Sequence, residues 1–412
     1  MTKITIGRMS RVIVIGAGMV GLATAWHLQE RGYDVTVMDK EGVAAGASWG
    51  NAGWLAPAKT IPLSNPSLWR YGPTALLDAD AALSMPIRFD PRLWGFLARF
   101  MGQATTRAWD ATMAALTPID LEALAAFDEL ELGGVDAWTR KGPFVIGFEE
   151  ESQAAGFLRE IEGAVRHGQE APLTPLDDVQ SLAPMLSDAI TCAYRLDGQR
   201  FIEPGPYVEA LGRAVEERGG VIRTGAEVVS VNGDSVVLDT GERVETDTVV
   251  IATGAWLPAL ARDHGVRTPV QAGRGYSFSV ETEQPAEHSV YLPHHRMACT
   301  PYQGRFRIAG TMEFRRPDEP LYPRRIEAIV NQARKVMTGV DLDNRQDEWV
   351  GSRPVTPDGR PLVGRTATEN VYVAGGHGMW GVVLGPATGK FLAQLIDTGE
   401  THPAIRPFDP LR

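Results

Sequence analysis

The chain has 412 residues, more than one typical domain, and its 44% hydrophobic and 22% charged residues are ordinary for a globular protein. A net charge of −11, with no long block of Lys or Arg, argues against nucleic acid as the main partner. No apolar run reaches the roughly 18 residues of a membrane-spanning helix, and residues 1–10 are a short polar segment without signal-peptide features. We therefore expect a cytoplasmic protein. Cys192 and Cys299 lie in no metal-ligand spacing, so we expect two passive thiols and no metal site.

The first elements of the chain form a β-α-β unit between Arg11 and Asp39. Residues 12–15 are a continuous β-branched run, which is typical of a parallel strand buried on both faces. A glycine-rich turn follows, then a helical pattern that Gly32 ends, then a second strand that ends before Asp39.

The rest of the chain alternates helical and extended patterns, with no internal repeat. We expect helices over 21–30, 91–109, 117–132, 152–167, 204–219, 323–338 and 386–398, and strands over 12–15, 34–38, 142–148, 221–224, 227–232, 235–239, 243–245, 248–252, 271–281, 305–311 and 370–374. Strands predicted to be fully buried lie at the start, in the middle and near the end of the chain. Helices and strands of a predicted antiparallel sheet lie between them.

This order predicts an α/β protein in which a Rossmann-like nucleotide-binding domain is interleaved with an α+β substrate domain that contains an antiparallel sheet. The predicted nucleotide-binding domain comprises 1–60, 200–268 and 345–412. The predicted substrate domain comprises 61–199 and 269–344.

Residues 16–21 read GAGMVG, a G-x-G-x-x-G motif directly after the first strand. Gly16 permits the tight turn, Gly18 lets the backbone approach a pyrophosphate, and Gly21 lets helix and strand pack closely. The N–H groups at the helix start then meet the phosphate charge. Asp39 follows the second strand, 23 positions after Gly16, where an acidic residue binds a ribose hydroxyl. The motif predicts a dinucleotide, and by itself leaves NAD and FAD open.

Four further motifs appear in order: GASWGNAG at 46–53, GRGYS at 273–277, GSRPVTPDG at 351–359 and GHGMWG at 376–381. Together they resemble the D-amino-acid oxidase superfamily of flavoproteins over nearly the whole chain. Within it the sequence looks most like the bacterial D-amino-acid dehydrogenases, with glycine oxidase and sarcosine oxidase as more distant relatives. The resemblance implies FAD as the cofactor and a glycine-oxidase-like fold.

The resemblance also implies which residues line the FAD, in addition to the glycine motif and Asp39. The complete predicted set is Gly16, Gly18, Met19, Val20, Gly21, Asp39, Lys40, Ala47, Ser48, Asn51, Ala52, Gly53, Val228, Ala252, Thr253, Gly254, Gly376, Gly378, Met379, Gly381 and Val382. Val228 would meet the adenine through its backbone. The apolar Met379 and Trp380 depart from the more polar loop of glycine oxidases, which argues against a second carboxylate ligand there.

Arg353 is the first predicted catalytic residue, because the resemblance assigns the arginine of this motif to the substrate carboxylate. A guanidinium can hold a carboxylate with two parallel hydrogen bonds and so fix its position. The alternative is an ordinary ion pair, for instance with Asp358.

Tyr276 and His377 are the other two predicted catalytic residues. The Tyr276 hydroxyl would touch the substrate carboxylate or amine; the alternative is a tyrosine packed in the sheet. His377 would contact the flavin or the substrate; the alternative is a histidine that only braces its loop. Gly385-Pro386 predicts that the last helix begins at Pro386, and its dipole would then stabilise reduced flavin if its start faced the ring.

The predicted function is FAD-dependent oxidative deamination of D-amino acids to 2-oxo acids, with a hydride passing from Cα to flavin N5. Two alternatives stay open: oxidation of glycine, sarcosine or a cyclic imino acid such as D-hydroxyproline, and a non-catalytic flavin subunit of an amine dehydrogenase complex. The partners would be the amino or imino acid and an electron acceptor, quinone-like or O₂. The segment 91–109 carries Leu, Trp and Phe among three Arg, so peripheral contact with the inner face of the cell membrane is an alternative to a core helix.

Overall fold

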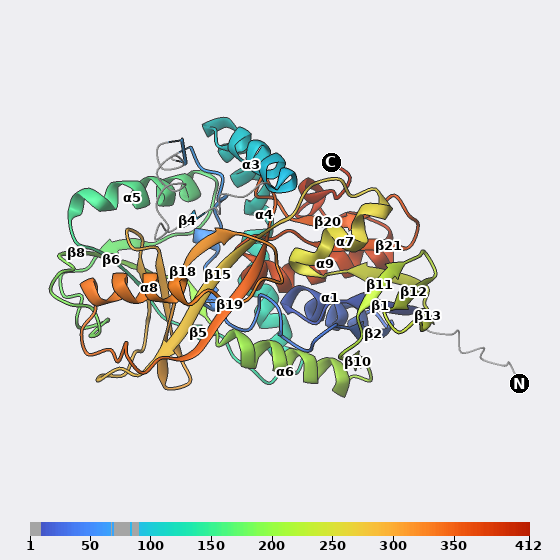
Figure 1. Ribbon diagram of the computed structural model, residues 1–412, viewed down its shortest axis with the longest axis horizontal. Coiled ribbons are helices and arrows are strands. Elements are labelled where there is room, and N and C mark those ends of the chain that lie inside the picture. The colour runs from blue at the N-terminus through green and yellow to red at the C-terminus, as the bar shows by residue number, and fades with distance from the viewer. Residues whose placement is uncertain (1–9, 67, 70–82, 85–89) are drawn as a thin grey trace, which may run out of the picture.

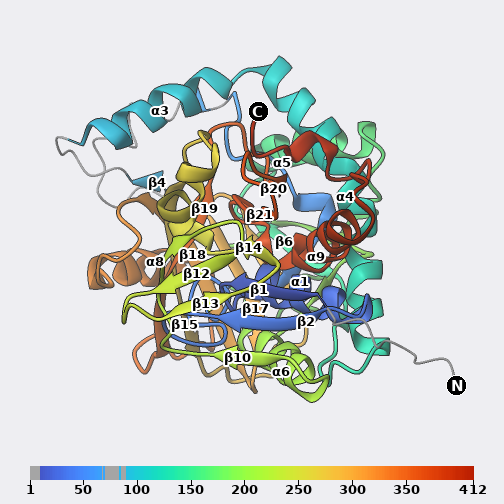
Figure 2. The same ribbon diagram turned by 90° about the vertical axis from the view of Figure 1, so that its right-hand side faces the viewer.

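Two large β-sheets organise the chain (Figures 1 and 2). The computed structural model describes residues 10–66, 68–69, 83–84 and 90–412, so most of the predicted polar N-terminal segment lies outside the described residues. In Figure 1 the six-stranded sheet, with α1 and α9, occupies the right half and the nine-stranded sheet the left half. This architecture confirms the predicted α/β fold with a Rossmann-like part and an antiparallel sheet, while the two domain boundaries stay predictions.

The six-stranded sheet is parallel except for its last strand. Its strands are, in spatial order, β10 (Val221–Arg223), β2 (Asp34–Met38), β1 (Arg11–Ile15), β14 (Thr248–Ile251), β21 (Val371–Gly375) and β20 (Leu362–Arg365). Three distant parts of the chain thus supply neighbouring strands, as the sequence predicted.

Both faces of this sheet are buried, which explains the continuous apolar run of β1. Val12 and Val14 point into a core shared with α1 (Met19–Glu30) and α9 (Gly381–Thr398), whereas Ile13 and Ile15 point into a second core. That second core lies against α7 (Leu257–Ala261) and a three-stranded sheet of β11 (Val228–Val231), β12 (Ser235–Leu238) and β13 (Arg243–Glu245).

The nine-stranded sheet is antiparallel over β19, β15, β18, β17 and β16. In spatial order its strands are β19 (Gln346–Val355), β15 (Gln271–Val280), β18 (Arg305–Phe314), β17 (Met297–Tyr302), β16 (Ser289–Leu292), β6 (Phe144–Phe148), β8 (Cys192–Leu196) and β7 (Leu173–Pro175), with β4 (Leu83–Ser84) beside β18.

The remaining elements cover these sheets. They are α3 (Pro91–Gln103), α4 (Thr106–Leu132), α5 (Glu151–Arg166), α6 (Pro204–Glu217), α8 (Pro323–Val336), the 3₁₀ turns η1 (Pro57–Lys59), η2 (Gly254–Trp256), η3 (Arg262–His264) and η4 (Arg406–Phe408), and a small sheet of β3 (Trp54–Leu55), β9 (Arg200–Phe201) and β5 (Arg140–Lys141). None of the helices within the described residues is long and apolar enough to span a membrane.

Three helix predictions need correction. The predicted helix 91–109 is two helices, because Thr105 breaks the first and its side chain accepts a hydrogen bond from Ala108 N as the cap of α4. The predicted helix 117–132 is only the second half of α4. The last helix begins at Gly381 instead of Pro386, and Pro386 lies inside it.

The position of α3 bears on the alternative of membrane contact. Its apolar side chains Leu93, Phe96, Leu97 and Phe100 are buried against Phe314 and Val355. This burial favours a core helix, with Trp94 and Arg99 on the exposed side.

The contact between α1 and α9 depends on a glycine. A Cβ at Gly389 would lie 2.6 Å from the Ala23 carbonyl carbon and the Thr24 nitrogen, so the two backbones approach where only glycine fits. Gly156, in α5, is exposed and has nothing within 4 Å of its own Cβ position.

We therefore predict opposite effects from two Gly→Ala substitutions in helix interiors. Alanine in place of an open helical glycine gains about 0.5–1 kcal/mol, whereas overpacking a core costs about 1–3 kcal/mol. Gly156→Ala should raise the midpoint of urea unfolding, and Gly389→Ala should lower it. Equal shifts in the two variants would show that α9 moves away from α1 without cost.

Candidate active site

The carboxyl ends of four parallel strands meet at one edge of the six-stranded sheet. Ile15 of β1 pairs with Met38 of β2 and with Ile251 of β14, and Ile251 pairs with Val373 of β21. The segments that follow these strands are therefore neighbours, as in ligand sites of open α/β sheets. They contain the predicted FAD residues that begin at Gly16, Asp39, Ala252 and Gly376.

The three glycines of the first motif have distinct structural roles. Gly16 has φ +114°, and its Cβ would lie 2.5 Å from the Ala252 carbonyl oxygen. A Cβ at Gly21 would lie 1.9 Å from the Gly16 oxygen, so this glycine permits the close packing of turn and helix. Gly18 precedes α1 and faces the Ser48 hydroxyl, which would lie 3.2 Å from an added Cβ.

Ser48 lies at the start of α1, where its Oγ accepts a hydrogen bond from Met19 N at 3.2 Å. The cap residue Gly18 offers no side chain, and the first turn of α1 has no acidic residue. The positive end of this helix is therefore left for a phosphate. The Thr253 hydroxyl is buried with no hydrogen-bond partner among the described residues. Both observations fit an FAD bound along this edge.

Asp39 lies where the sequence predicted it, at the end of β2. Its carboxylate accepts hydrogen bonds from Ala17 N at 2.8 Å and from Glu41 N at 2.8 Å and Gly42 N at 3.0 Å. Its backbone oxygen accepts from Ala226 N, which brings the segment before Val228 to the same place. These contacts connect the glycine turn to the predicted adenosine side of the site.

The loop 49–53 is tied to the nine-stranded sheet by three side chains, of which only Ser277 belongs to one of the sequence motifs. Arg307 donates to the Trp49 oxygen at 3.2 Å, Ser277 to the Gly50 oxygen at 2.8 Å, and Thr300 to the Ala52 oxygen at 2.6 Å. The predicted FAD loop thus lies directly on this sheet.

Arg353 lies on the same face of this sheet. It pairs with Gly273 across β19 and β15, and its guanidinium covers Gly275: a Cβ there would lie 2.1 Å from Cζ and both Nη atoms. The side chain is partly exposed, and burial lowers its pKa to about 10, so it keeps its charge at neutral pH. Within the described part of the chain no carboxylate forms an ion pair with it. A hydrogen bond of 3.4 Å to the Thr311 oxygen is its only contact of that kind there.

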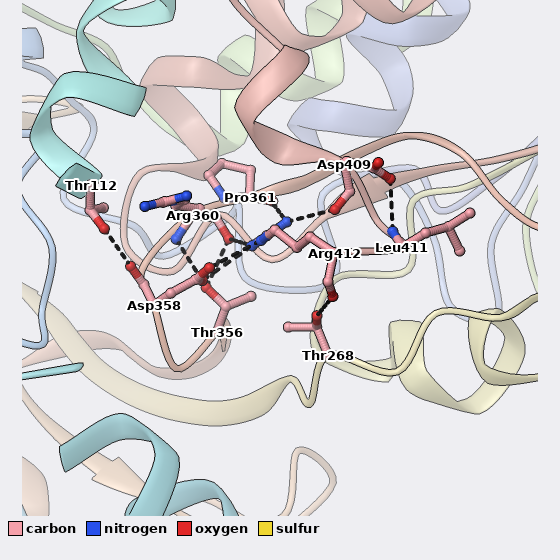
Figure 3. Close-up of polar contacts among 9 residues, drawn as sticks. All are labelled: Thr112, Thr268, Thr356, Asp358, Arg360, Pro361, Asp409, Leu411 and Arg412. Atoms are coloured by element: carbon pink, nitrogen blue, oxygen red, sulfur yellow. Dashed lines mark hydrogen bonds and ion pairs between the residues drawn. The ribbon is translucent and has the colours of Figure 1, made fainter. Parts of the chain in front are cut away.

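The suggested ion pair between Arg353 and Asp358 is wrong. Asp358 instead binds the guanidinium of Arg412, with N–O distances of 3.0 and 3.1 Å (Figure 3). The C-terminal arginine also donates to the Pro361 and Arg360 oxygens, so it holds the turn that follows β19. Arg353 is left to face the site.

The GHG loop lies beside Arg353. Gly378 N donates to the Pro354 oxygen at 2.8 Å, and His377 forms a bridge with Val355. The His377 ring is buried, contacts the Thr388 hydroxyl at 3.0 Å, and has its pKa lowered to about 4 by burial. The ring is therefore neutral at pH 7 and braces the loop against α9. The start of α9 at Gly381 directly follows this loop.

Tyr276 lies on the opposite face of the sheet from Arg353. Its ring is fully buried in the core against α8, and its hydroxyl donates to Glu313. Burial, and then the hydrogen bond to Glu313, raise the pKa of this phenol. The structure thus places Tyr276 away from the other site residues, which corresponds to the alternative of a tyrosine packed in the sheet.

The small residues of β15 explain this division and could have revealed it. Gly273, Gly275, Ser277 and Ser279 alternate with Arg274, Tyr276, Phe278 and Val280. Since side chains alternate between the faces of a strand, the small residues form the face that receives Arg353 and the loop 49–53. Tyr276 belongs to the other set.

The two cysteines are free and lie in β8 and β17. Burial raises the pKa of both thiols, and Cys299 is completely buried in the core beneath α8. Neither feature favours a reactive thiolate.

The sheet and its glycine cradle define a dinucleotide-binding protein, and comparison with known proteins specifies the family. The model of the DAO family, described as FAD dependent oxidoreductase, matches residues 11–395, so the chain belongs to that family. The protein is accordingly an FAD-dependent oxidoreductase.

Relatives of the chain extend over nearly its whole length. It is 29% identical to a D-amino acid dehydrogenase of Paramagnetospirillum magneticum, with 94% of each chain covered. It is 30% identical to a D-amino acid dehydrogenase of Methylobacterium sp. (strain 4-46), with 96% of each covered. The fold matches glycine oxidase from Geobacillus kaustophilus with a TM-score of 0.76 and 23% identity, covering 98% of this chain and 99% of that one.

Gly275 offers a direct test of where the guanidinium lies. Gly275→Ala would place a methyl group on the Arg353 guanidinium and displace it. Since a flexible side-chain end moves without disturbing the fold, we expect FAD absorbance to be retained. KM for the amino acid should rise at least about tenfold, equivalent to about 1.4 kcal/mol. Gly156→Ala is the matched control and should leave KM unchanged; an unchanged KM in Gly275→Ala itself would contradict the placement of Arg353.

His377 makes a second prediction, about stability and pH. Because its folded pKa of about 4 lies below the unfolded value of 6.5, the unfolded chain takes up this proton first as the pH falls. Stability from the neutral ring is thus complete above pH 6.5 and is lost towards pH 4, by up to about 3 kcal/mol. His377→Asn should flatten this part of the curve of unfolding free energy against pH. Equal slopes in the parent and in His377→Asn would refute the assignment.

Proposed function

We propose that this protein oxidises D-amino acids, with Arg353 binding the substrate carboxylate. The observation that carries the proposal is the state of its guanidinium. It is charged, only partly exposed to water, and has no carboxylate partner among the described residues, yet it lies beside the loops predicted to hold FAD. A guanidinium without an ion-pair partner is stabilised most by an anionic ligand with two oxygens in one plane, because such a ligand accepts two parallel hydrogen bonds.

The chain contributes position and electrostatics to this reaction. Arg353 would hold the carboxylate on the face of β15, β18 and β19, and so fix the direction of the Cα–H bond. FAD, when bound, supplies the acceptor for the hydride from Cα. His377 stays neutral and takes no part in proton transfer. The amine would bind in its neutral form, its ammonium proton having passed to solvent, and its lone pair would then assist the loss of hydride. The imine product then hydrolyses to a 2-oxo acid and ammonia.

The choice of D-amino acids follows the names of the relatives that cover the whole chain. The small or cyclic amino acids suggested by the sequence remain the second candidate, favoured by the likeness of the fold to glycine oxidase and to L-proline dehydrogenase from P. horikoshii, whose TM-score is 0.69 at 20% identity. A screen of D-alanine, glycine, sarcosine and D-hydroxyproline with an artificial electron acceptor separates them by kcat/KM. Turnover by the isolated chain would exclude a non-catalytic subunit.

For the electron acceptor we propose a quinone-like molecule reached at a membrane surface. The apolar face of α3 is buried in the protein, so contact with such a surface would fall to the exposed Trp94 and Arg99 on its other face. Hydrogen peroxide formed in air with kcat close to that in the artificial-acceptor assay would instead identify O₂ as the acceptor. Recovery of the protein entirely in the supernatant of lysed cells would count against the membrane contact.

Arg353→Lys tests the proposed function. Lysine keeps the charge but loses the planar pair of donors, so KM for D-alanine should rise at least about tenfold while the flavin spectrum stays the same. Arg243→Lys, at an exposed arginine paired with Asp234, is the control and should behave as the parent. If Arg353→Lys kept the parent KM, the assignment of Arg353 to the carboxylate would be lost.

A further inference from the structure

A β-bulge in β18 lies across β15 from Arg353 in the nine-stranded sheet. Between β15 and β18, Arg274 pairs with Glu313 and Tyr276 pairs with Gly310, so Thr311 and Met312 together face the single residue Gly275. Gly275 is the residue that the guanidinium covers. The bulge therefore lies at the same point of the sheet as the proposed carboxylate site.

Thr311 has an unusual backbone conformation at this bulge. Its φ of +54° lies in the left-handed region, which β-branched residues rarely adopt. Backbone outliers of this kind persist where the surrounding structure enforces them, and they cluster at ligand sites. The conformation turns the Thr311 carbonyl oxygen towards Arg353, whose Nη1 donates to it at 3.4 Å.

The Thr311 hydroxyl has no hydrogen-bond partner in the described part of the chain. Its Oγ1 is shielded from solvent and forms no hydrogen bond with any of the described residues. The bulge interrupts the alternation of β18: Gly310 before it faces Ile329 of α8, whereas Thr311 and Met312 together lie opposite Gly275, the residue that Arg353 covers. Met312, next along the strand, has its sulfur 3.0 Å from a Cβ position at Gly273, on the face that receives Arg353.

Two hydrogen-bond donors thus belong to the same point of the sheet. Among the described residues the guanidinium of Arg353 has one long contact and the hydroxyl of Thr311 has none. A shielded donor without an acceptor is unfavourable. A carboxylate offers about four acceptor positions, of which a bidentate guanidinium uses two. The missing acceptor for Thr311 is therefore available on the ligand that Arg353 would bind.

We propose that the Thr311 hydroxyl donates a hydrogen bond to the substrate carboxylate held by Arg353, so that Thr311 is a second substrate-binding residue. The proposal rests on the proposed function of Arg353. It adds a donor from a different strand, which fixes the carboxylate plane against rotation about the guanidinium.

The experiment measures binding instead of turnover. Propionate, which has the carboxylate but no amine, is titrated into the FAD-loaded protein, and its Kd is obtained from the change in flavin absorbance. Thr311→Val removes only the hydroxyl, since valine has the same branching and nearly the same size, and its Kd should rise about tenfold. Thr311→Ser keeps the hydroxyl, and its Kd should stay within about twofold of the parent value.

Thr311→Gly separates binding from folding. Glycine favours the positive φ, so this variant folds even if Thr311→Val does not, and its Kd for propionate should also rise about tenfold. An unchanged Kd in Thr311→Gly or Thr311→Val would overturn the proposal, as would an equal loss in Thr311→Ser.

The same titration with Arg353→Lys distinguishes the two assignments. If Arg353→Lys weakens propionate binding and the hydroxyl-free Thr311 variants do not, only the role of Thr311 fails. If Arg353→Lys binds propionate like the parent, the proposed function fails as well.

Discussion

The site depends on one charge, that of Arg353, which is only partly exposed to water and has no carboxylate partner among the described residues. The guanidinium of Arg353 lies on Gly275, and burial lowers its pKa without neutralising it. Asp358, an acidic residue five positions further along the chain, is bound to Arg412 instead. A partly buried charge without an ion-pair partner lowers the stability of the fold. The position of Arg353 is therefore best explained by an anionic ligand that pairs with the guanidinium.

The arrangement of the two sheets explains how this charge comes to lie beside the FAD segments. The parallel sheet gathers the ends of β1, β2, β14 and β21 at one edge, and the antiparallel sheet presents its glycine- and serine-lined face to that edge. Direct hydrogen bonds connect the two parts: Ser277 and Thr300 bind the loop 49–53, and Gly378 N binds the Pro354 oxygen. A chain that crosses between the sheets can therefore fix cofactor loops and substrate arginine in one rigid unit.

Local signals predicted the nucleotide-binding part well. The strand–glycine–helix unit and the acid at its end depend on neighbours in sequence, so the motif and the structure agree from Gly16 to Asp39. The same holds for the buried strand β21 and the loop after it. The motifs also named Arg353, although no strand was predicted around it.

The errors came from features that depend on distant parts of the fold. The sequence did not predict β16, β17 or β19, and in β19 the reason is that its polar and glycine residues are acceptable only inside the sheet. Pro386 was taken as a helix start, but α9 packs on α1 tightly enough to continue through it. Tyr276 was assigned to the site from its motif, although the alternation of β15 directs it to the opposite core. The bulge at Thr311 has no signature in sequence, since it arises from pairing with Gly275, 36 positions earlier.

The most direct measurement is the anaerobic reduction of the bound flavin after rapid mixing with D-alanine, L-alanine and ethylamine. Ethylamine carries the amine and a similar carbon chain but has no carboxylate for Arg353. The account predicts rapid loss of flavin absorbance with D-alanine alone. Reduction by ethylamine at a comparable rate, or by neither alanine enantiomer nor any other amino acid, would contradict it.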